Sequence, residues 1–280
     1  MDLTPWGAPA LGARLGGGHR NEVYRVGDDW VVRRSRRSVA SLEWELDLLD
    51  HLSQHGFLVP GVVPTRDGRR HVDGVVMQRW LPGREPSDGD WPLVVAELRR
   101  LHALMTGWPP RPDFPGTREL LTVDQGGDVD LASMPAEVVA RCRKAWRGLD
   151  GALTVIHGDP CAANIRVVEE RELKDRDGEG RGPERRVEGT ETGGEQAGRR
   201  PAVRIGFLDW DEARVDNPWL DLADIPGVAA IPGLGVPTAA KAAVDAWETV
   251  NAWVMEPPYA RRRLARLAVD KSVDNRPSCG

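Results

Sequence analysis

Up to Arg79 the chain alternates short apolar runs with turns, apart from one longer stretch of helical periodicity. Runs at 21–26, 30–33, 62–64 and 71–79 are rich in valine and are separated by Gly-Asp turns, which predicts strands. Between Ser38 and Leu52 the apolar residues recur every three or four positions, which predicts an amphipathic helix. The pattern therefore indicates a small β-sheet accompanied by one helix.

Beyond Arg79 the helical period dominates. One helix begins near Trp91, and its apolar face holds Val94, Leu98, Leu101 and Met105. Further helices are expected at 135–149, 238–255 and 259–269. The predicted fold class is α+β, with an N-terminal lobe at residues 1–79 and a mainly helical C-terminal lobe at 80–280. A chain of 280 residues is long enough for one two-lobed domain.

Two apolar runs in the second lobe each end in polar side chains. The run 153–156 leads into His157-Gly158-Asp159, with Asn164 five positions after the aspartate, and the run 205–208 ends at Asp209. In the catalytic loop of protein kinases an Asp precedes an Asn with four residues between them, and a later Asp holds Mg²⁺. One carboxylate orients a hydroxyl, while an amide and a second carboxylate hold the metal on the phosphates. The spacing therefore indicates phosphoryl transfer.

These motifs resemble the aminoglycoside phosphotransferase family, a small-molecule branch of the kinase-like fold. That family has His-Gly-Asp in the catalytic loop and Ile/Leu-Asp-Trp/Phe later, which correspond here to His157-Gly158-Asp159 and Leu208-Asp209-Trp210. The stretch 216–223 resembles a third family motif, Asp-Pro-x-x-Asp-Leu-Ala. The likeness covers nearly the whole chain except residues 169–202.

The resemblance implies a protein-kinase-like two-lobed fold and a function in phosphorylating a hydroxyl of a small molecule with ATP or GTP and Mg²⁺. Asp159 is then the catalytic residue, and Asn164 and Asp209 are the metal ligands. His157 and Asp221 are assigned to structural support of the catalytic loop.

The first lobe supplies candidates for nucleotide binding. Gly16, Gly17 and Gly18 could bring backbone amides close to phosphates, although such glycines also form ordinary flexible turns. A kinase needs a cation on the third strand and a helix glutamate that holds it. Arg33 stands where the lysine is usual, unless it belongs to a solvated basic cluster with its neighbours. We assign Glu45, rather than Glu43, as its partner, because Glu45 lies nearer the apolar stripe of the helix.

The stretch 75–83 resembles the hinge of the family, where backbone groups at the end of the strand contact the nucleotide base. Met77 and Gln78 are the expected hinge positions. An interior strand that runs into a Pro-Gly turn would have the same pattern, so the pattern alone does not decide.

The net charge and the distribution of apolar residues limit the kinds of binding partner that we expect. The net charge of −5 gives no support to a nucleic-acid partner, and it suits a cationic small substrate, which Asp211 and Glu212 could contact unless they are simply solvated. The chain shows no signal peptide and no long apolar stretch, so we expect a cytoplasmic protein without a membrane partner. Residues 169–202 combine both charges and glycines with almost no large apolar side chains, and we expect a disordered insertion there.

Two other classes of function stay open. The chain could be a nucleotide-binding protein without catalysis, since the usual lysine is replaced and the insertion is long. It could instead be a metal-dependent hydrolase that uses His157, Asp159, Asp209 and Asp211 as ligands. This second alternative does not account for the glycine turn or the hinge-like strand.

Overall fold

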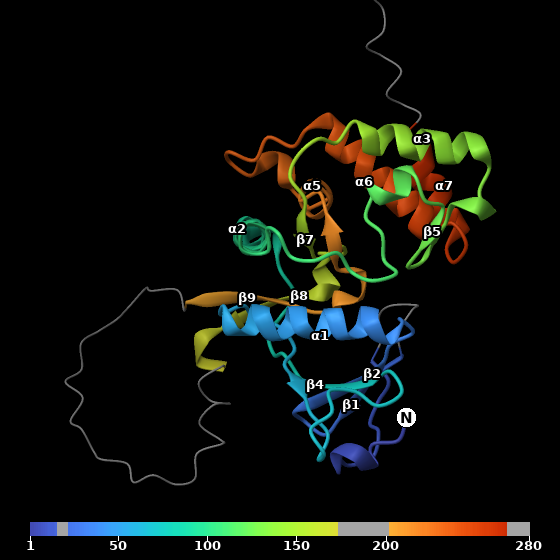
Figure 1. Cartoon of the computed structure of the whole chain (residues 1–280). Coiled ribbons are helices and arrows are strands. Elements are labelled where there is room, and N and C mark those ends of the chain that lie inside the picture. The colour runs from blue at the N-terminus through green and yellow to red at the C-terminus, as the bar shows by residue number, and fades with distance from the viewer. Residues whose placement is uncertain (16–21, 173–201, 268–280) are drawn as a thin grey trace, which may run out of the picture.

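A computed structural model describes residues 1–15, 22–172 and 202–267 of the chain. Figure 1 shows two lobes, a sheet at the N-terminal end and a group of helices at the other, with helix α1 (Val39–Gln54) lying between them. The two-lobed α+β fold expected from the sequence is thus present. Gly16 to Gly18 and residues 173–201 of the expected insertion lie outside the described residues.

The first lobe is a four-stranded antiparallel sheet in the order β1-β2-β4-β3. Its strands are β1 (Glu22–Val26), β2 (Trp30–Arg34), β3 (Val62–Val63) and β4 (Val75–Arg79). Side chains alternate between the two faces, so Val32 and Met77 pack with the N-terminal segment on the outer face. Arg33, which is paired in register with Val76, belongs to the other face, toward α1. The sheet thereby presents a cation to the helix.

Helix α1 is buried on most of its circumference. Ser38 caps its N-terminus, where the side-chain oxygen accepts a hydrogen bond from the Ser41 amide at 3.2 Å. Leu46, Leu48 and Leu52 are fully buried, in one cluster that also contains side chains of the sheet and of the second lobe. The helix therefore forms part of the core of both lobes.

The second lobe combines five helices with short strand pairs among the described residues. The helices are α2 (Trp91–Leu104), α3 (Ala136–Arg147), α5 (Trp219–Leu222), α6 (Thr238–Asn251) and α7 (Pro257–Arg266). The strands are β5 (Gln125–Gly126), β6 (Val129–Asp130), β7 (Thr154–Ile156), β8 (Ile165–Glu169), β9 (Val203–Phe207) and β10 (Arg214–Asp216). They pair antiparallel as β5 with β6, β7 with β10, and β8 with β9. The second core cluster lies chiefly between α3 and α6.

Backbone hydrogen bonds hold the first lobe and the segment that follows it against the pair of β8 and β9. After β4 the chain reaches Arg84, whose carbonyl accepts from the Val167 amide of β8 at 2.8 Å. After α1, the Leu58 carbonyl accepts from Phe207 of β9 at 2.9 Å. The approach is so close at Gly206 that a Cβ atom there would lie 2.6 Å from the Leu81 side chain. The strand that leads to Asp209 is therefore held directly against the first lobe.

Several element boundaries differ from those expected. The strand expected from His71 begins only at Val75, because Asp73 and Gly74 form a turn with φ of 49° and 74°. The helix expected to reach residue 255 ends at Asn251, and the last helix begins earlier, at Pro257, since proline is well suited to a first helical turn. Within the described part of the chain, none of the helices has the length and apolarity needed to cross a membrane.

The burial of α2 predicts the effect of two substitutions on stability. Leu98 is 0% exposed in the shared core, whereas Leu93 on the same helix is 47% exposed. We expect Leu98→Ala to lower the free energy of unfolding by about 2–5 kcal/mol, because it removes buried methyl groups and leaves a cavity. Leu93→Ala should change it by about 0.5 kcal/mol or less. Urea unfolding measures both, and equal effects would contradict the proposed packing.

Candidate active site

The loop after β7 carries Asp159 and Asn164. Asp159 is exposed, and Asn164 closes a single 3₁₀ turn before β8. The Asn164 amide nitrogen donates to the Asp159 carboxylate at 2.9 Å and to the Asp159 carbonyl at 3.0 Å. This contact orients the carboxylate. It also leaves the side-chain oxygen of Asn164 available to another ligand.

The strand β9 brings Asp209 to the same place. The Leu208 amide donates to the Asn164 carbonyl at 2.8 Å, so Asp209 directly follows a residue bonded to the catalytic loop. Asp209 has a positive φ of 52°, which turns the chain sharply after the strand. Desolvation by the surrounding protein and then the Asp211 carboxylate raise the pKa of Asp209, and Arg33 opposes them. A cation at this carboxylate would relieve that repulsion.

His157 connects the loop that carries Asp159 to the segment that leads to Asp209. Its Nε2 contacts the Leu208 carbonyl at 2.8 Å, and its Nδ1 accepts from the Asp159 amide at 3.3 Å. These partners assign the proton to Nε2. The ring packs against Trp210 at 4.7 Å between centroids. Because both ring nitrogens are engaged, His157 is not available as a metal ligand, which removes a ligand from the hydrolase alternative.

Asp221 fixes the backbone of the catalytic loop. Its carboxylate accepts from the amides of His157 at 2.8 Å and Gly158 at 2.9 Å, and His102 Nε2 contacts it at 2.8 Å. Burial disfavours the charge, but the hydrogen bond and charge of His102 outweigh it and hold the pKa of Asp221 below its usual value. The buried carboxylate is thus stable as an anion and positions the loop.

Gly158 is required by this geometry. Its φ is 92°, in the left-handed region, and a Cβ atom would lie 2.4 Å from the Glu212 carbonyl oxygen. The segment that follows Asp209 therefore packs directly on the backbone beside Asp159.

The first lobe contributes the pair of Arg33 and Glu45. Arg33 Nη2 forms an ion pair with Glu45 Oε1, and Arg33 Nε donates to Gln78 Oε1 at 3.3 Å. The exposed fractions of the two side chains are 8% and 1%. Arg33 Nη1 is also buried and has no hydrogen-bond partner. An unsatisfied guanidinium nitrogen at this position fits an anionic ligand such as a phosphate.

The arginines that follow one another from Arg33 differ in burial, because successive side chains of a strand point to opposite faces of the sheet. Arg33 is buried, whereas Arg34 and Arg36 are exposed. On α1, Glu43 contacts Arg70 and His71 on the outer side, away from Arg33. The buried glutamate that meets the strand cation is Glu45.

Met77 and Gln78 do not lie where a hinge is expected. Both are interior residues of β4, which pairs with β2 on one side and with β3 on the other. Both side chains are buried, and Met77 packs on the outer face of the sheet. The expectation that these two positions form the hinge needs correction, because sheet pairing engages their backbone. The chain leaves the sheet after Arg79, so the connecting segment 80–84 is the better candidate.

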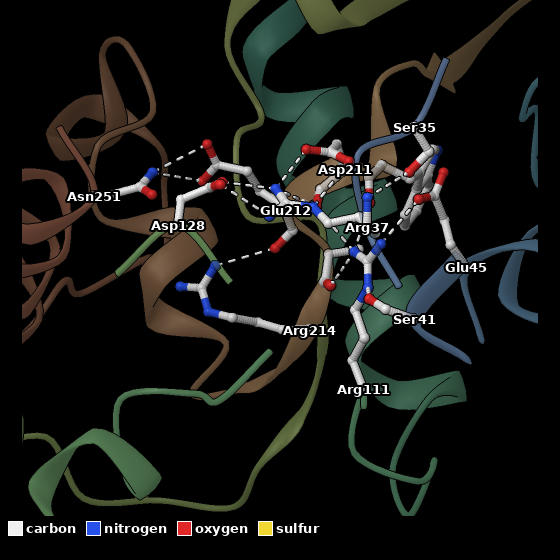
Figure 2. Close-up of polar contacts among 12 residues, drawn as sticks. Ser35, Arg37, Ser41, Glu45, Arg111, Asp128, Asp211, Glu212, Arg214 and Asn251 are labelled. Carbon is white, nitrogen blue, oxygen red and sulfur yellow. Dashed lines mark hydrogen bonds and ion pairs between the residues drawn. The ribbon is translucent and has the colours of Figure 1, made fainter. Parts of the chain in front are cut away.

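Asp211 and Glu212 also have partners within the protein. Arg37 donates to both oxygens of the Asp211 carboxylate, at 3.2 and 2.5 Å, and to Asp128 at 2.9 and 2.7 Å. Burial opposes the charge on Asp211, but Arg37 prevails and lowers the pKa of that carboxylate. Asn251 of α6 donates to both carboxylate oxygens of Glu212 at 3.1 Å. Asp211 thus fastens the loop, while Glu212 faces the helical lobe (Figure 2).

The motifs of the sequence did not reveal Arg37, Arg111 and Asp128. Figure 2 shows Arg37 and Arg111 beside Glu45 and Asp211, where the two lobes meet. These residues lie in loops without periodicity or a recurring motif, and their contacts join positions as far apart as 174 residues. No local pattern distinguishes these residues, because their partners lie on distant segments of the chain.

Asn164 and Asp209 suit a magnesium ion. Mg²⁺ prefers oxygen ligands, and in phosphoryl-transfer sites it is held by one or two protein groups together with phosphates and water. The free amide oxygen of Asn164 and the carboxylate of Asp209 provide such a pair. Across the described ranges no three His, Cys, Asp or Glu side chains form a group that could hold a metal by themselves.

The contacts of Asp221 predict a pH-dependent stability. Its folded-state pKa is lowered, so its contribution to stability is present above the unfolded value of about 3.9 and is lost as pH falls through the folded value. We expect Asp221→Asn to lower the free energy of unfolding by about 3 kcal/mol at pH 7, because three donors lose a charged acceptor. The difference from the unsubstituted protein should shrink below about pH 4. Denaturant unfolding across pH measures it, with Asp29→Asn on the surface as control, and a difference independent of acidity would contradict the assignment.

Solved structures of small-molecule kinases are among those similar to this chain. The microcompartment-associated aminopropanol kinase matches with a TM-score of 0.59 and 19% identity, over 95% of this chain and 92% of that one. The amicoumacin kinase hAmiN, in complex with AMP-PNP, Ca²⁺ and Ami, matches with a TM-score of 0.59 and 14% identity, over 95% and 90%. The GDP and kanamycin complex of APH(2")-IIia matches with a TM-score of 0.58 and 16% identity, over 97% of both chains. No curated protein sequence matches significantly.

Residues 12–173, more than half of the chain, match the phosphotransferase enzyme family. This segment contains the sheet lobe and the loop after β7 that carries Asp159 and Asn164. The chain belongs to the phosphotransferase enzyme family and is a small-molecule kinase with a protein-kinase-like fold.

Proposed function

We propose that this protein transfers the γ-phosphoryl group of ATP or GTP to a hydroxyl of a small amino alcohol in the cytoplasm. The observation that carries the proposal is the convergence of Asp159, Asn164 and Asp209, joined by the 2.9 Å side-chain contact and the 2.8 Å backbone contact described above. An arginine with an unsatisfied buried nitrogen lies on the opposite lobe. Together these groups match the requirements of phosphoryl transfer.

Asp159 accepts the proton of the substrate hydroxyl or orients that hydroxyl. The carboxylate is exposed, so a substrate can reach it, and the Asn164 amide holds it in place. Asn164 Oδ1 and the Asp209 carboxylate would hold Mg²⁺, which would supply neutralisation of the phosphate charge. No covalent intermediate is needed, because the transition state is loose and depends on positioning and charge.

Arg33 holds the α- and β-phosphates of the nucleotide. Glu45 and Gln78 fix two of its nitrogens, which leaves Nη1 for a phosphate oxygen. An arginine presents a planar fork where kinases usually have the compact ammonium of lysine. Gly16, Gly17 and Gly18 would cover the phosphates, and segment 80–84 would contact the base.

The acceptor is proposed to carry an amine because carboxylates lie near Asp159. The pKa of Glu248 on α6 is raised, chiefly by burial and also by the negative charges of Asp159 and Asp224. Arg263 and a hydrogen bond from Tyr259 lower it, but do not cancel the rise. Glu212 lies against Asn251 on the same helix. One of the similar structures is named as an aminopropanol kinase. Another is named as a complex with GDP and kanamycin. A cationic group would relieve the repulsion among these carboxylates.

Replacement of Asp159 should abolish transfer while nucleotide binding persists. We expect Asp159→Asn to reduce turnover by about 100- to 10,000-fold, the range of positioned proton acceptors. The measurement is mass spectrometry of phosphorylated products from a panel of amino alcohols and aminoglycosides with MgATP and MgGTP. Nucleotide affinity, measured by calorimetry, is the internal control.

A product that forms equally with Asp159→Asn would contradict the catalytic role of Asp159. Nucleotide binding without any product across the panel would favour the non-catalytic alternative. Failure of the folded protein to bind either nucleotide would refute the phosphotransferase proposal.

Two adjacent arginines test the phosphate contact. We expect Arg33→Met to weaken MgATP or MgGTP binding by about 10- to 100-fold, because a charged hydrogen bond to phosphate is lost. Arg34→Met, which alters the exposed neighbour, should leave the affinity unchanged. Calorimetric titration of both variants checks this, and equal losses would show that only the overall charge matters.

A further inference from the structure

Arg111 is a buried cation that no motif of the family resemblance includes. It lies in the loop after α2, and its side chain is 0% exposed. Figure 2 shows it extending toward α1 on one side and toward the segment after Asp209 on the other.

On the side of the first lobe, Arg111 contacts helix α1. Its Nη2 donates to Glu45 Oε2 at 3.0 Å, and its Nε donates to the Ser41 hydroxyl at 2.8 Å. Glu45 Oε1 is the atom paired with Arg33. The two oxygens of one carboxylate are thus divided between two guanidinium groups.

On the side of the second lobe, Arg111 contacts the backbone directly after Asp209. Its Nη1 donates to the carbonyl oxygens of Asp211 and Ala213 at 2.9 Å each and lies 3.3 Å from that of Trp210. Only a planar group with several donors can reach a carboxylate, a hydroxyl and these carbonyls at once.

We propose that Arg111 is a positioning residue that couples the phosphate-binding Arg33 to the metal-binding loop of Asp209, acting through Glu45. The inference rests on the proposed function. Because the same guanidinium holds Glu45 and the 210–213 backbone, a displacement of either moves the other. The cation for the nucleotide phosphates and the carboxylate for the metal are thereby kept at a fixed separation.

The guanidinium of Arg111 is costly to bury. Burial lowers the pKa of Arg111, although the negative charges of Glu45 and Asp211 raise it. An apolar side chain would fill this space at a lower desolvation cost, so the charge at this position indicates a specific role. Two aromatic rings line the guanidinium, Phe114 at 5.2 Å and Trp44 at 5.4 Å. The group is held rigidly rather than solvated.

A double-mutant cycle tests the coupling. Calorimetry with MgATP and with MgGTP would compare the unsubstituted protein, Arg111→Lys, Glu45→Gln and the double variant. We expect Arg111→Lys to weaken binding about tenfold alone and by less than about twofold in the Glu45→Gln background. Arg143→Lys is the matched control, since Arg143 donates to the carbonyls of Leu120 and Val123 at 2.8 and 2.9 Å within the helical lobe. It should not alter nucleotide affinity.

Unchanged affinity in Arg111→Lys, or an equal loss in both backgrounds, would overturn the coupling. An unsubstituted protein that binds neither nucleotide would instead refute the proposed function. Thermal unfolding verifies that each variant is folded.

If Arg111→Lys does not fold, Ser41→Ala removes only the acceptor of Nε. We then expect about two- to threefold weaker binding in the Ser41→Ala variant, and no such loss when Ser41→Ala is combined with Glu45→Gln. No change with Ser41→Ala would overturn the inference.

Discussion

The arrangement of the site depends on a carboxylate that is almost completely withdrawn from water. Glu45 is 1% exposed, and an isolated charge there would be too costly to keep. Its two oxygens are satisfied by Arg33 from the sheet and by Arg111 from the helical lobe. Helix α1, which carries Glu45, is buried between both lobes by apolar packing. The ion pairs of Glu45 add charged contacts from both lobes to that packing.

A second buried carboxylate, that of Asp221, holds the backbone of the loop before Asp159 in place. Asp221 holds the amides of His157 and Gly158, while His157 itself bonds to the strand that precedes Asp209. The exposed Asp159 therefore rests on a network that is buried from solvent. A group that reacts with substrate must be accessible to it, whereas the groups that support it need a fixed geometry.

The fold and much of the site could be predicted from local patterns. Helical spacing predicted α1 and α2. The spacing from Asp159 to Asn164 and the apolar run before Asp209 predicted two segments that the structure brings into contact. The angular position of Glu45 on its helix distinguished it from Glu43. Arg37 and Arg111 escaped prediction because a loop arginine acquires its partners only when distant segments fold together. The run that contains β3 was expected as a strand, but its pairing with β4 beside Met77 and Gln78 could not be predicted from local pattern, because strand order depends on how distant segments meet.

The pairing of β8 with β9 has a practical consequence. The two strands are in register from Ile165 opposite Phe207 to Glu169 opposite Val203, and the Glu170 amide donates to the Ala202 carbonyl at 3.0 Å. The chain thus leaves and re-enters this hairpin at adjacent points, at the end opposite Asp209. Loop length between such points has little effect on closure entropy. The position is therefore a natural insertion point for a fluorescent reporter or an affinity tag, which would leave the geometry around Asp209 undisturbed.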